Sequence, residues 1–485
     1  MSEAIKGLKP ELVWKYFAEI AKIPRGSKNE AAVARYVLET AKKLGLQAQQ
    51  DKIGNVVVKK PASPGKERLP SVALQGHLDM VCEKNAGTVH DFTKDAIELV
   101  RKNDVIMANG TTLGADNGIA VATNLAIMED KSLAHGPLEF LFTIDEEVGL
   151  GGASNLQPGF IESKTLMNLD SEEEGALYVG CSGGMDTVGR WELDMESAPS
   201  GSVAATIKVN GLRGGHSGLE IDKNRGNAIK ILNRTLLRLE DLGVRLSSIH
   251  GGNKRNAIPR ECEAVCFVPK KNLEKILTAV KEVEATVKAE FASTDADVSI
   301  TFTPAKGTSK GKVIRKALQK KLTRTISGLP HGVIKMSPDI KDLVETSTNV
   351  AVIRTEKKMI VMETSQRSSV GSELEEIACT ASSVFEMGHA DVSHEHSYPG
   401  WKPDMKSRIL GVARTTYKNL YGKEPQVKAI HAGLECGIIG EKYPGIDMVS
   451  FGPTLEGVHS PDEKIYIDTV EKFWKFLLEI LKNVK

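Results

Sequence analysis

Four segments within the first 170 residues are apolar almost without interruption, and helical patterns lie between them. They are "NVVVKK" from Asn55, "SVALQG" from Ser71, "PLEFLFTI" from Pro137 and "TLMNLD" from Thr165. Strands that are apolar on both faces are typical of a sheet covered by helices on both sides. The stretch "GIAVATNLAIMED", from Gly118, has the pattern of a helix between two such strands. We therefore predict an α/β fold, in which reactive groups usually lie at the carboxyl ends of the strands.

One helix of this region has a candidate start signal. "SKNE", from Ser27 to Glu30, has the spacing of a capping box, and apolar residues then follow at helical intervals from Val33 to Leu44. We predict that Ser27 caps this helix.

The pattern changes near residue 195 and returns near residue 400. Between these points "SVAATIKVN", "DVSITFT", "NVAVIRT" and "KMIVMET" have the alternation of half-buried strands, and residues 226–240 and 271–290 carry apolar helical stripes. The α/β pattern resumes with "QVKAI", "IDMVSFG" and a terminal helix. We predict one domain over residues 1–195 and 395–485, interrupted by a smaller α+β domain over residues 196–394.

Charge and cysteine content exclude several classes of function. Lys+Arg number 64 and Asp+Glu 63, a formal charge of +1, so electrostatics gives no reason to expect a nucleic-acid or anionic-membrane partner. The sequence contains neither an apolar run of membrane-spanning length nor a signal-peptide core at its start. Six scattered cysteines are typical of reduced thiols. We expect a cytoplasmic protein.

Histidines and carboxylates follow several of the predicted strands. His77 and Asp79 end the first of these strands, and their spacing of two makes them point the same way. Taken alone, this pair fits a surface histidine beside a carboxylate as well as it fits a metal ligand with its orienting partner. Further groups of the same kind are Asp116 in a glycine-flanked turn, Glu146 and Glu147 in "DEEVG", Asp170 in "NLDSEEEG" and His459 in "GVHSPDE". Carboxylates gathered on one sheet edge would repel one another unless cations lay between them.

This set of residues fits two zinc ions. Two divalent ions about 3.5–4 Å apart need a bridging carboxylate, and Asp116 is the candidate. One terminal histidine and one terminal carboxylate on each ion would complete the ligands. Imidazole with carboxylate suits zinc, manganese or cobalt, and the lack of thiolates argues against a structural zinc finger. One of Glu146 and Glu147 then remains as a base for water.

These motifs carry a family resemblance. "HLD", "GADNG", "DEEVG" and "LDSEEEG", in this order and with a late "HSP", resemble the co-catalytic zinc peptidases that include the aminoacylases and peptidase T. "GLRGGHSG", "GGNKRNAIPRE", "YPGWKPD", "HAGLECG" and "GPTLEGVHSPDE" resemble more closely the group of aminoacyl-histidine dipeptidases, or cytosol non-specific dipeptidases. The matching segments run from residue 77 to residue 463. Cys82 departs from the pattern, since many relatives have proline there, but it is no ligand.

The resemblance implies a fold and a metal site. It implies a catalytic domain with a mixed sheet flanked by helices, and an inserted lid that also forms a homodimer. It places His77 and Asp170 on one zinc, Glu147 and His459 on the other, and Asp116 between them. It further implies that Asp79 orients His77 and that Glu146 is the general base.

The resemblance also implies roles for four residues that their local sequence alone leaves open. His216 would donate to the oxyanion, either within the chain or from a partner chain, and Asn256 and Arg367 would clasp the substrate's carboxylate, which a guanidinium fork suits. Glu435 would face the substrate's ammonium group. Without the family, Arg367 would be interpreted as a surface arginine and His216 as an exposed loop histidine.

The predicted reaction is hydrolysis of the peptide bond of dipeptides with broad specificity, including Xaa-His dipeptides, by a zinc-activated bridging water. A deacylase of N-acyl amino acids with the same metals is a near alternative, and a peptide-binding protein with an inactive site is another. A mononuclear site at "HEHS", His394 to Ser397, is a third alternative, but the sequence offers no third ligand nearby.

Overall fold

The computed structural model describes residues 3–306 and 310–485 of the 485-residue chain. The chain forms two compact units. The first holds the chain up to Gly180 together with Trp401–Ala429 and Leu434–Lys485, and the second holds Cys181–Gly400 and Ile430–Gly433. Each unit is described by itself below.

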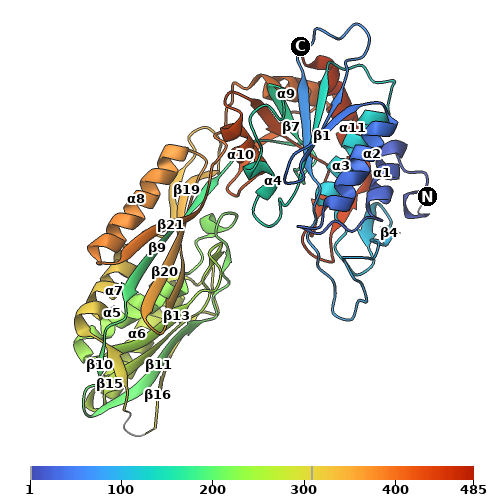
Figure 1. Cartoon of the computed structure of the whole chain (residues 1–485). Coiled ribbons are helices and arrows are strands. Elements are labelled where there is room, and N and C mark those ends of the chain that lie inside the picture. Colours follow the sequence, from blue (N-terminus) through green and yellow to red (C-terminus); the bar gives the residue numbers. More distant parts are fainter. Residues whose placement is uncertain (1–2, 307–309) are drawn as a thin grey trace. The chain divides into compact units, whose positions relative to one another are not determined.

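The first unit is built on an eight-stranded mixed sheet (Figure 1). In spatial order the strands are β1 (Gln47–Gln50), β2 (Val56–Lys60), β6 (Leu138–Thr143), β3 (Val72–His77), β7 (Thr165–Asn168), β23 (Asp447–Ser450), β8 (Ala176–Cys181) and β22 (Gln426–Ile430). Four neighbouring strands in its middle run parallel to one another, and the pairs β1–β2, β2–β6 and β23–β8 are antiparallel. This confirms the predicted α/β class, and the strands expected at "NVVVKK", "SVALQG", "PLEFLFTI" and "TLMNLD" are present.

Helices cover both faces of this sheet, which explains its continuously apolar strands. On one face a Cβ added to Gly76 of β3 would lie 2.8 Å from the Cβ of Ala120, so helix and strand touch closely there. On the other face Leu141 and Leu166 pack with Ile439. The helices of this unit are α1 (Glu11–Ile20), α2 (Ala31–Lys43), α3 (Ala115–Glu129), α4 (Gly151–Ser154), α9 (Arg408–Tyr421), α10 (Glu435–Lys442) and α11 (Ile467–Asn483).

A small four-stranded sheet completes the first unit. Its strands, in spatial order, are β24 (Leu455–Glu456), β25 (Lys464–Tyr466), β5 (Val105–Ala108) and β4 (Leu99–Lys102).

The predicted capping box at Ser27 is wrong. Helix α2 begins at Ala31, and its N-cap residue, Glu30, makes no capping hydrogen bond with its side chain. The hydroxyl of Ser27 instead donates to Asp79 Oδ2 over 2.8 Å. The local sequence allows Ser27 either to cap helix α2 or to bind a distant residue. In the folded chain the hydrogen bond to Asp79 is the one that forms.

The second unit is a nine-stranded antiparallel sheet whose helices lie along one face in Figure 1. Along β11 the side chains of Val203, Ala205, Ile207 and Val209 are buried and the alternate residues from Ala204 to Asn210 are half-buried, as the predicted alternation requires. The strands are β9 (Gly183–Glu192), β11 (Ser202–Asn210), β13 (Arg245–Gly251), β15 (Cys262–Pro269), β16 (Ser299–Pro304), β18 (Gly332–Met336), β19 (Val344–Thr355), β20 (Met359–Ser368) and β21 (Asp391–Tyr398). The helices are α5 (Ala228–Leu239), α6 (Leu273–Glu290), α7 (Lys316–Gly328) and α8 (Gly371–Met387).

Two short strand pairs also belong to the second unit. They are β10 (Met195–Ser197) with β17 (Lys312–Ile314), and β12 (Gly215–His216) with β14 (Ala257–Ile258).

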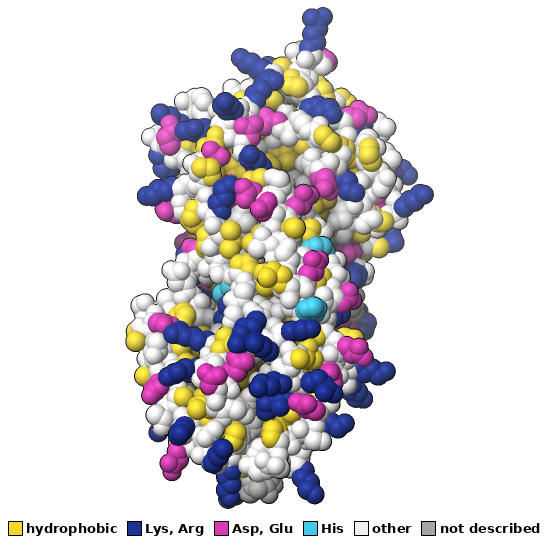
Figure 2. All heavy atoms as spheres, turned by 90° about the vertical axis from the view of Figure 1, so that its left-hand side faces the viewer, with side chains coloured by type: hydrophobic (Ala, Val, Ile, Leu, Met, Phe, Trp, Pro, Cys, Tyr) yellow, Lys and Arg dark blue, Asp and Glu magenta, His cyan; other side chains and the backbone are white. Residues whose placement is uncertain are grey.

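The surface agrees with the near-zero formal charge. Figure 2 shows basic and acidic side chains intermingled over the face that it presents. Among the helices of residues 3–306 and 310–485, none has both the length and the apolar character that crossing a bilayer requires.

Leu74 tests the packing of the central sheet. Its side chain is fully buried on β3, between Phe140 of β6 and Met167 of β7 in the strand register. We expect Leu74→Ala to lower the free energy of unfolding by about 2–5 kcal/mol, because it removes buried contacts and leaves a cavity. Urea denaturation followed by circular dichroism measures this. Val89→Ala, at a fully exposed position, should change it by less than about 0.5 kcal/mol.

Candidate metal centre

The carboxyl ends of the four parallel strands carry the candidate ligands of the first unit. His77 is the last residue of β3, and Glu146 and Glu147 lie in the turn after β6. Asp170 follows β7 by two residues, and His459 lies further along the chain beyond β23, in the loop between β24 and β25. Since parallel strands end at the same sheet edge, residues far apart in sequence arrive together.

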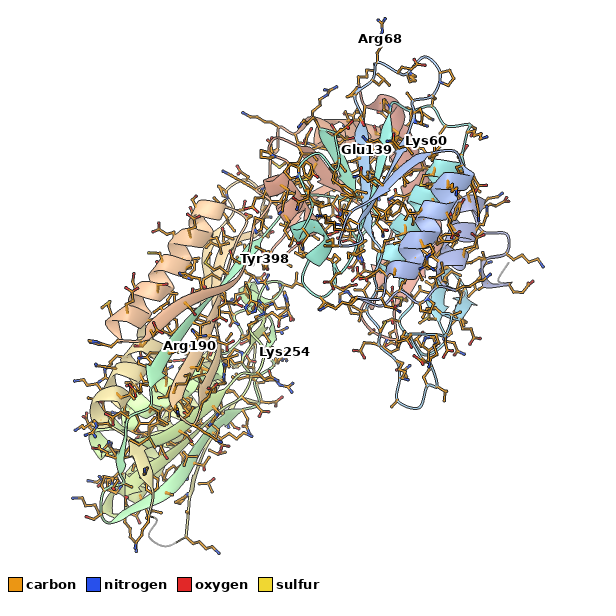
Figure 3. All side chains as sticks on the ribbon, viewed as in Figure 1. Lys60, Arg68, Glu139, Arg190, Lys254 and Tyr398 are labelled. Atoms are coloured by element: carbon orange, nitrogen blue, oxygen red, sulfur yellow. The ribbon has the colours of Figure 1, made fainter. Side chains whose placement is uncertain are left out.

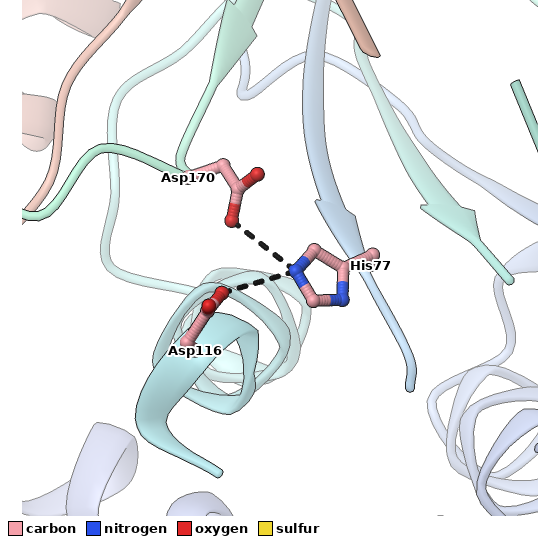
Figure 4. Close-up of side chains that lie close together, drawn as sticks. All are labelled: His77, Asp116 and Asp170. Carbon is pink, nitrogen blue, oxygen red and sulfur yellow. Dashed lines mark hydrogen bonds and ion pairs between the residues drawn. The ribbon is translucent and has the colours of Figure 1, made fainter. Parts of the chain in front are cut away.

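Asp116, in the first turn of α3, lies between the two histidines. Its Oδ1 is 3.1 Å from His77 Nε2 and its Oδ2 is 3.1 Å from His459 Nε2. Asp170 Oδ1 lies 3.4 Å from the same nitrogen of His77 (Figure 4). Glu147 Oε2 lies 3.0 Å from His459 Nε2. The five side chains thus form two groups of three that share Asp116.

The ligand atoms in each group are close enough to hold one ion. In the sets His77–Asp116–Asp170 and Asp116–Glu147–His459 these atoms lie within 4.8 Å of one another. Buried oxygens of Glu147 and Asp170 have no hydrogen-bond partner. Imidazole nitrogens with carboxylate oxygens are a donor set that divalent zinc, manganese or cobalt accepts. The residues therefore fit a centre for two divalent cations.

The carboxylates of this cluster are buried and repel one another, so positive charge stabilises them. Burial, opposed by His77 and reinforced by the nearby carboxylates of Asp116 and Glu147, raises the pKa of Asp170 to about 6. Hydrogen bonds that the His459 ring donates to the carboxylates of Asp116 and Glu147 raise the pKa of His459 to about 11. Carboxylates held this close are stabilised by cations between them.

Asp79 is buried behind His77 and fixes the surrounding turn. Its Oδ1 lies 3.3 Å from His77 Nδ1, the ring nitrogen that faces away from Asp116. The same carboxylate accepts hydrogen bonds from the backbone N–H groups of Glu146 (3.0 Å) and Glu147 (3.2 Å). Burial alone would raise the pKa of Asp79, but these contacts and His77 lower it to about 2. An ionised carboxylate at this position can orient the imidazole.

Glu146 lies beside the candidate ligands His77 and Glu147. One of its oxygens forms a further group within 4.8 Å with ligand atoms of His77 and Glu147. Burial raises the pKa of Glu146 well above its ordinary value, and the carboxylates of Asp170 and Glu435 add to this. A glutamate with a raised pKa is suited to accept and return a proton near neutral pH.

Glu435, at the start of α10, is fully buried in a polar network. Its Oε2 accepts hydrogen bonds from Gln75 Nε2 (2.6 Å) and Thr143 Oγ1 (2.7 Å), while its Oε1 has no partner. Burial raises the pKa of this carboxyl to about 7. Its predicted contact with a substrate ammonium stays a prediction.

In the second unit, His216 is held as a neutral donor. Its Nδ1 accepts hydrogen bonds from the backbone N–H groups of Gly218 (3.2 Å) and Leu219 (3.1 Å), which places the ring proton on Nε2. Burial, with the positive charge of Arg367, lowers the pKa of His216 to about 4. Asn256 is exposed and lines the same cavity as His216, of about 640 Å³.

Arg367 lies on β20 and is only 7% exposed. Its Nη1 donates to the hydroxyl of Tyr398 over 3.0 Å, at the end of β21 (Figure 3), and its Nε has no partner. Among the ion pairs of the described residues, none joins Arg367 to a carboxylate. The interpretation as a surface arginine therefore does not apply, because this guanidinium is buried and lacks an anion.

His431 is a neighbour of Arg367 that the sequence did not single out. Ser347 of β19 is paired with Arg367 in the sheet, so the two side chains share one face, and the hydroxyl of Ser347 lies 2.7 Å from His431 Nε2. Burial, then the charge of Arg367, lowers the pKa of His431 to about 3. The segment "HAGLECG" drew attention to this region, but nothing in it distinguishes this histidine.

His394 and His396 each contact a side chain of strand β9. His394 Nδ1 lies 3.2 Å from Thr187 Oγ1, and His396 Nδ1 lies 3.1 Å from Asp186 Oδ2. Within the described ranges, neither histidine belongs to a cluster of three potential ligands. The alternative of a mononuclear site here has no support from the geometry.

A family model, the sequence of a relative and two solved structures all match most of this chain. The model of Peptidase family M20/M25/M40 matches residues 73–483. The cytosol non-specific dipeptidase of Escherichia coli K12 is 40% identical over 485 residues, which cover 100% of this chain and 99% of the relative. The crystal structure of aminoacylhistidine dipeptidase from Vibrio alginolyticus is 40% identical, with a TM-score of 0.92 over 99% of this chain and 98% of that one. Aminopeptidase PepT from Bacillus cereus, 18% identical with a TM-score of 0.57 over 98% of this chain and 99% of that chain, shares the fold.

The neutral histidines of the second unit predict a pH dependence of stability. In the unfolded chain a histidine binds a proton below about pH 6.5, but folded His431 does so only near pH 3. Between these values the unfolded state binds more protons, so stability rises with pH. The urea concentration at the unfolding midpoint should therefore rise between pH 4.5 and 6.5. We expect this rise to be smaller in His431→Gln, which lacks the titrating group. The exposed His250 serves as control, and an equal effect of His250→Gln would contradict the assignment.

Proposed function

The chain belongs to peptidase family M20/M25/M40, and we propose that it is a metal-dependent dipeptidase of broad specificity that includes Xaa-His dipeptides. The observation that carries the proposal is the position of Asp116, whose two oxygens each face a different histidine. The 40% identical relatives, which span the whole chain, are named as a non-specific dipeptidase and an aminoacylhistidine dipeptidase.

We assign the metal centre to two zinc ions, for which manganese or cobalt could substitute. His77 and Asp170 would hold one ion, Glu147 and His459 the other, and Asp116 would bridge them. Zinc in such a site lowers the pKa of a coordinated water and polarises the carbonyl of the substrate. The pairing of ligands follows the two groups of three in the structure.

The proton steps fall to residues beside the ligands. Glu146 would accept the proton of the attacking water and return it to the amine that leaves. Its raised pKa, caused first by burial, suits both transfers near neutral pH. Asp79 would keep the ring of His77 turned so that Nε2 faces the centre.

The substrate's carboxylate is assigned to the second unit. Arg367 is buried with no acidic partner, which is costly for a cation unless an anion binds there. Asn256 would donate to the same carboxylate, and His216 would direct its Nε2–H at the developing oxyanion. Because His431 stays neutral, it would neither repel the guanidinium of Arg367 nor neutralise its charge, so that charge could attract the substrate's carboxylate. Glu435 would face the substrate's ammonium group.

Three further assignments concern the inserted domain, the oligomeric state and the compartment, and the first two follow from the family resemblance of the sequence motifs. The inserted residues 196–394 would act as lid and dimerisation domain, so the protein would be a homodimer, which sedimentation analysis can test. The relative from Escherichia coli is named as a cytosol enzyme, and we propose the same compartment.

A deacylase acting on N-acyl amino acids remains a second candidate because the same centre would serve it. The two activities differ at the amine end of the substrate. The buried Glu435, whose Oε1 has no partner, favours a substrate with a free ammonium group there. A panel of dipeptides and their N-acetyl forms, assayed on chelated protein with zinc, manganese or cobalt added back, tests the proposal. Binding of metal without hydrolysis of any member would favour a non-catalytic relative.

Glu146 tests the proton transfer. We expect Glu146→Ala to lower kcat by about 10²–10⁴-fold, because the base is lost, while zinc remains bound. Steady-state kinetics and metal analysis of the dialysed variant measure the two effects. Glu162→Ala, at a 72% exposed position of the same unit, is the control. Near-normal turnover in Glu146→Ala would contradict the role.

Arg367 tests the recognition of the carboxylate. We expect Arg367→Met to lower kcat/KM for dipeptides by about 1.5–3 kcal/mol in free energy, since a charged hydrogen bond is lost, and to leave dipeptide amides nearly unaffected. Arg190→Met, on the neighbouring strand β9 with its own partner Glu395 (Arg190 is labelled in Figure 3), is the matched control. Equal losses for acids and amides would show that Arg367 does not bind this carboxylate.

A further inference from the structure

The carboxylate of Glu463, four residues after His459, binds a row of backbone amides. It accepts hydrogen bonds from the N–H groups of four consecutive residues, at 2.7, 2.9, 2.7 and 3.2 Å for Leu113, Gly114, Ala115 and Asp116. Each oxygen takes two of them, and the side chain is only 2% exposed. The loop that presents Asp116 is therefore attached to the loop that presents His459.

A buried arginine attaches the same loop to a third one. The guanidinium of Arg25 donates to the backbone oxygens of Leu78 (2.9 Å) and Asp79 (2.8 Å), directly after His77, and to that of Gly114. Arg25 is 3% exposed. Two buried side chains of opposite charge thus connect the segments that carry His77, Asp116 and His459.

These contacts fix the one ligand that both metal positions share. Asp116 must keep its two oxygens directed at two different imidazoles, so a small rotation of its loop would harm both positions at once. The carboxylate of Glu463 restrains that loop through four backbone groups, including the N–H of Asp116 itself. Charge-assisted hydrogen bonds of this kind are stronger than neutral ones.

We propose that Glu463 is a positioning residue that sets the bridging geometry of Asp116, and that Arg25 supports it by tying Gly114 to the strand end of His77. The proposal rests on the proposed function only in taking this centre to hold two metal ions. Glu463 touches neither metal nor substrate in this role and acts through the backbone of residues 113–116.

The substitution Glu463→Gln tests this with little change in volume. A glutamine has one acceptor oxygen, so two of the four N–H groups would face an amide that cannot accept their hydrogen bonds. We expect zinc to bind about 10–100-fold more weakly, the range found when a group that orients metal ligands is lost. Chelator competition on metal-free protein measures this affinity independently of activity.

Glu139 provides the matched control. It is also a buried carboxylate, 3% exposed, and it accepts hydrogen bonds from the backbone N–H groups of Glu162 (2.9 Å) and Ser163 (2.8 Å). It lies near the start of β6 (Figure 3), whereas the metal centre lies beyond the end of that strand at Thr143. We expect both Glu139→Gln and Glu463→Gln to lower the melting temperature of the metal-free protein, but we expect Glu139→Gln to leave zinc affinity unchanged.

The outcomes separate positioning from general stability. Unchanged zinc affinity in Glu463→Gln, or an equal loss in both variants, would overturn the proposal. If Glu463→Gln does not fold, Glu463→Asp keeps two acceptor oxygens on a shorter stem, and its zinc affinity should lie below that of the wild type. An Asp variant that folds with wild-type affinity would equally overturn it. If the wild type hydrolyses no dipeptide while Glu463→Gln still loses zinc affinity, the proposed function fails and the positioning role stands.

Discussion

The concentration of negative charge at one edge of the first sheet is the constraint on which this unit depends. Asp116, Glu147 and Asp170 converge there on His77 and His459, with ligand atoms close together and largely buried. Repulsion among these carboxylates destabilises the folded state unless positive charge lies between them. Divalent cations supply that charge without a bulky side chain, so the centre can stay open to a substrate.

Among the described residues, the ligand carboxylates are held in place without a lysine or arginine that would compete with a cation for their oxygens. In the described part of the chain, Asp116, Glu147 and Asp170 form ion pairs with histidines and with no lysine or arginine. Their loops are instead held through backbone amides, four on Glu463 and two on Asp79. Because an N–H group has no net charge, this arrangement fixes the backbone and leaves the ligand oxygens for cations.

Strand composition predicted the class of the first unit, and the parallel order of β3, β6 and β7 then places His77, Glu147 and Asp170 at one edge. The sequence could not indicate partners that meet only in the folded chain. Ser27 has the spacing of a helix cap but donates to Asp79. Glu463 stood inside a quoted motif, yet nothing in its neighbourhood shows that it binds the amides of residues 113–116. Arg367 looked exposed because its burial depends on side chains from other strands.

The second unit has the opposite electrostatic problem, a buried cation without an anion. Two histidines of this unit stay neutral and so add no second positive charge. His216 accepts hydrogen bonds from two backbone N–H groups at Nδ1. His431 lies beside Ser347, and burial and the charge of Arg367 lower its pKa to about 3. Protonating either would add a second positive charge to a site built around one. A ligand with a single carboxylate would pair with Arg367, whereas a neutral terminus would leave the guanidinium buried and without an anion. If Arg367 binds the substrate carboxylate as proposed, we expect discrimination against amidated peptides to follow from the cost of that unpaired charge.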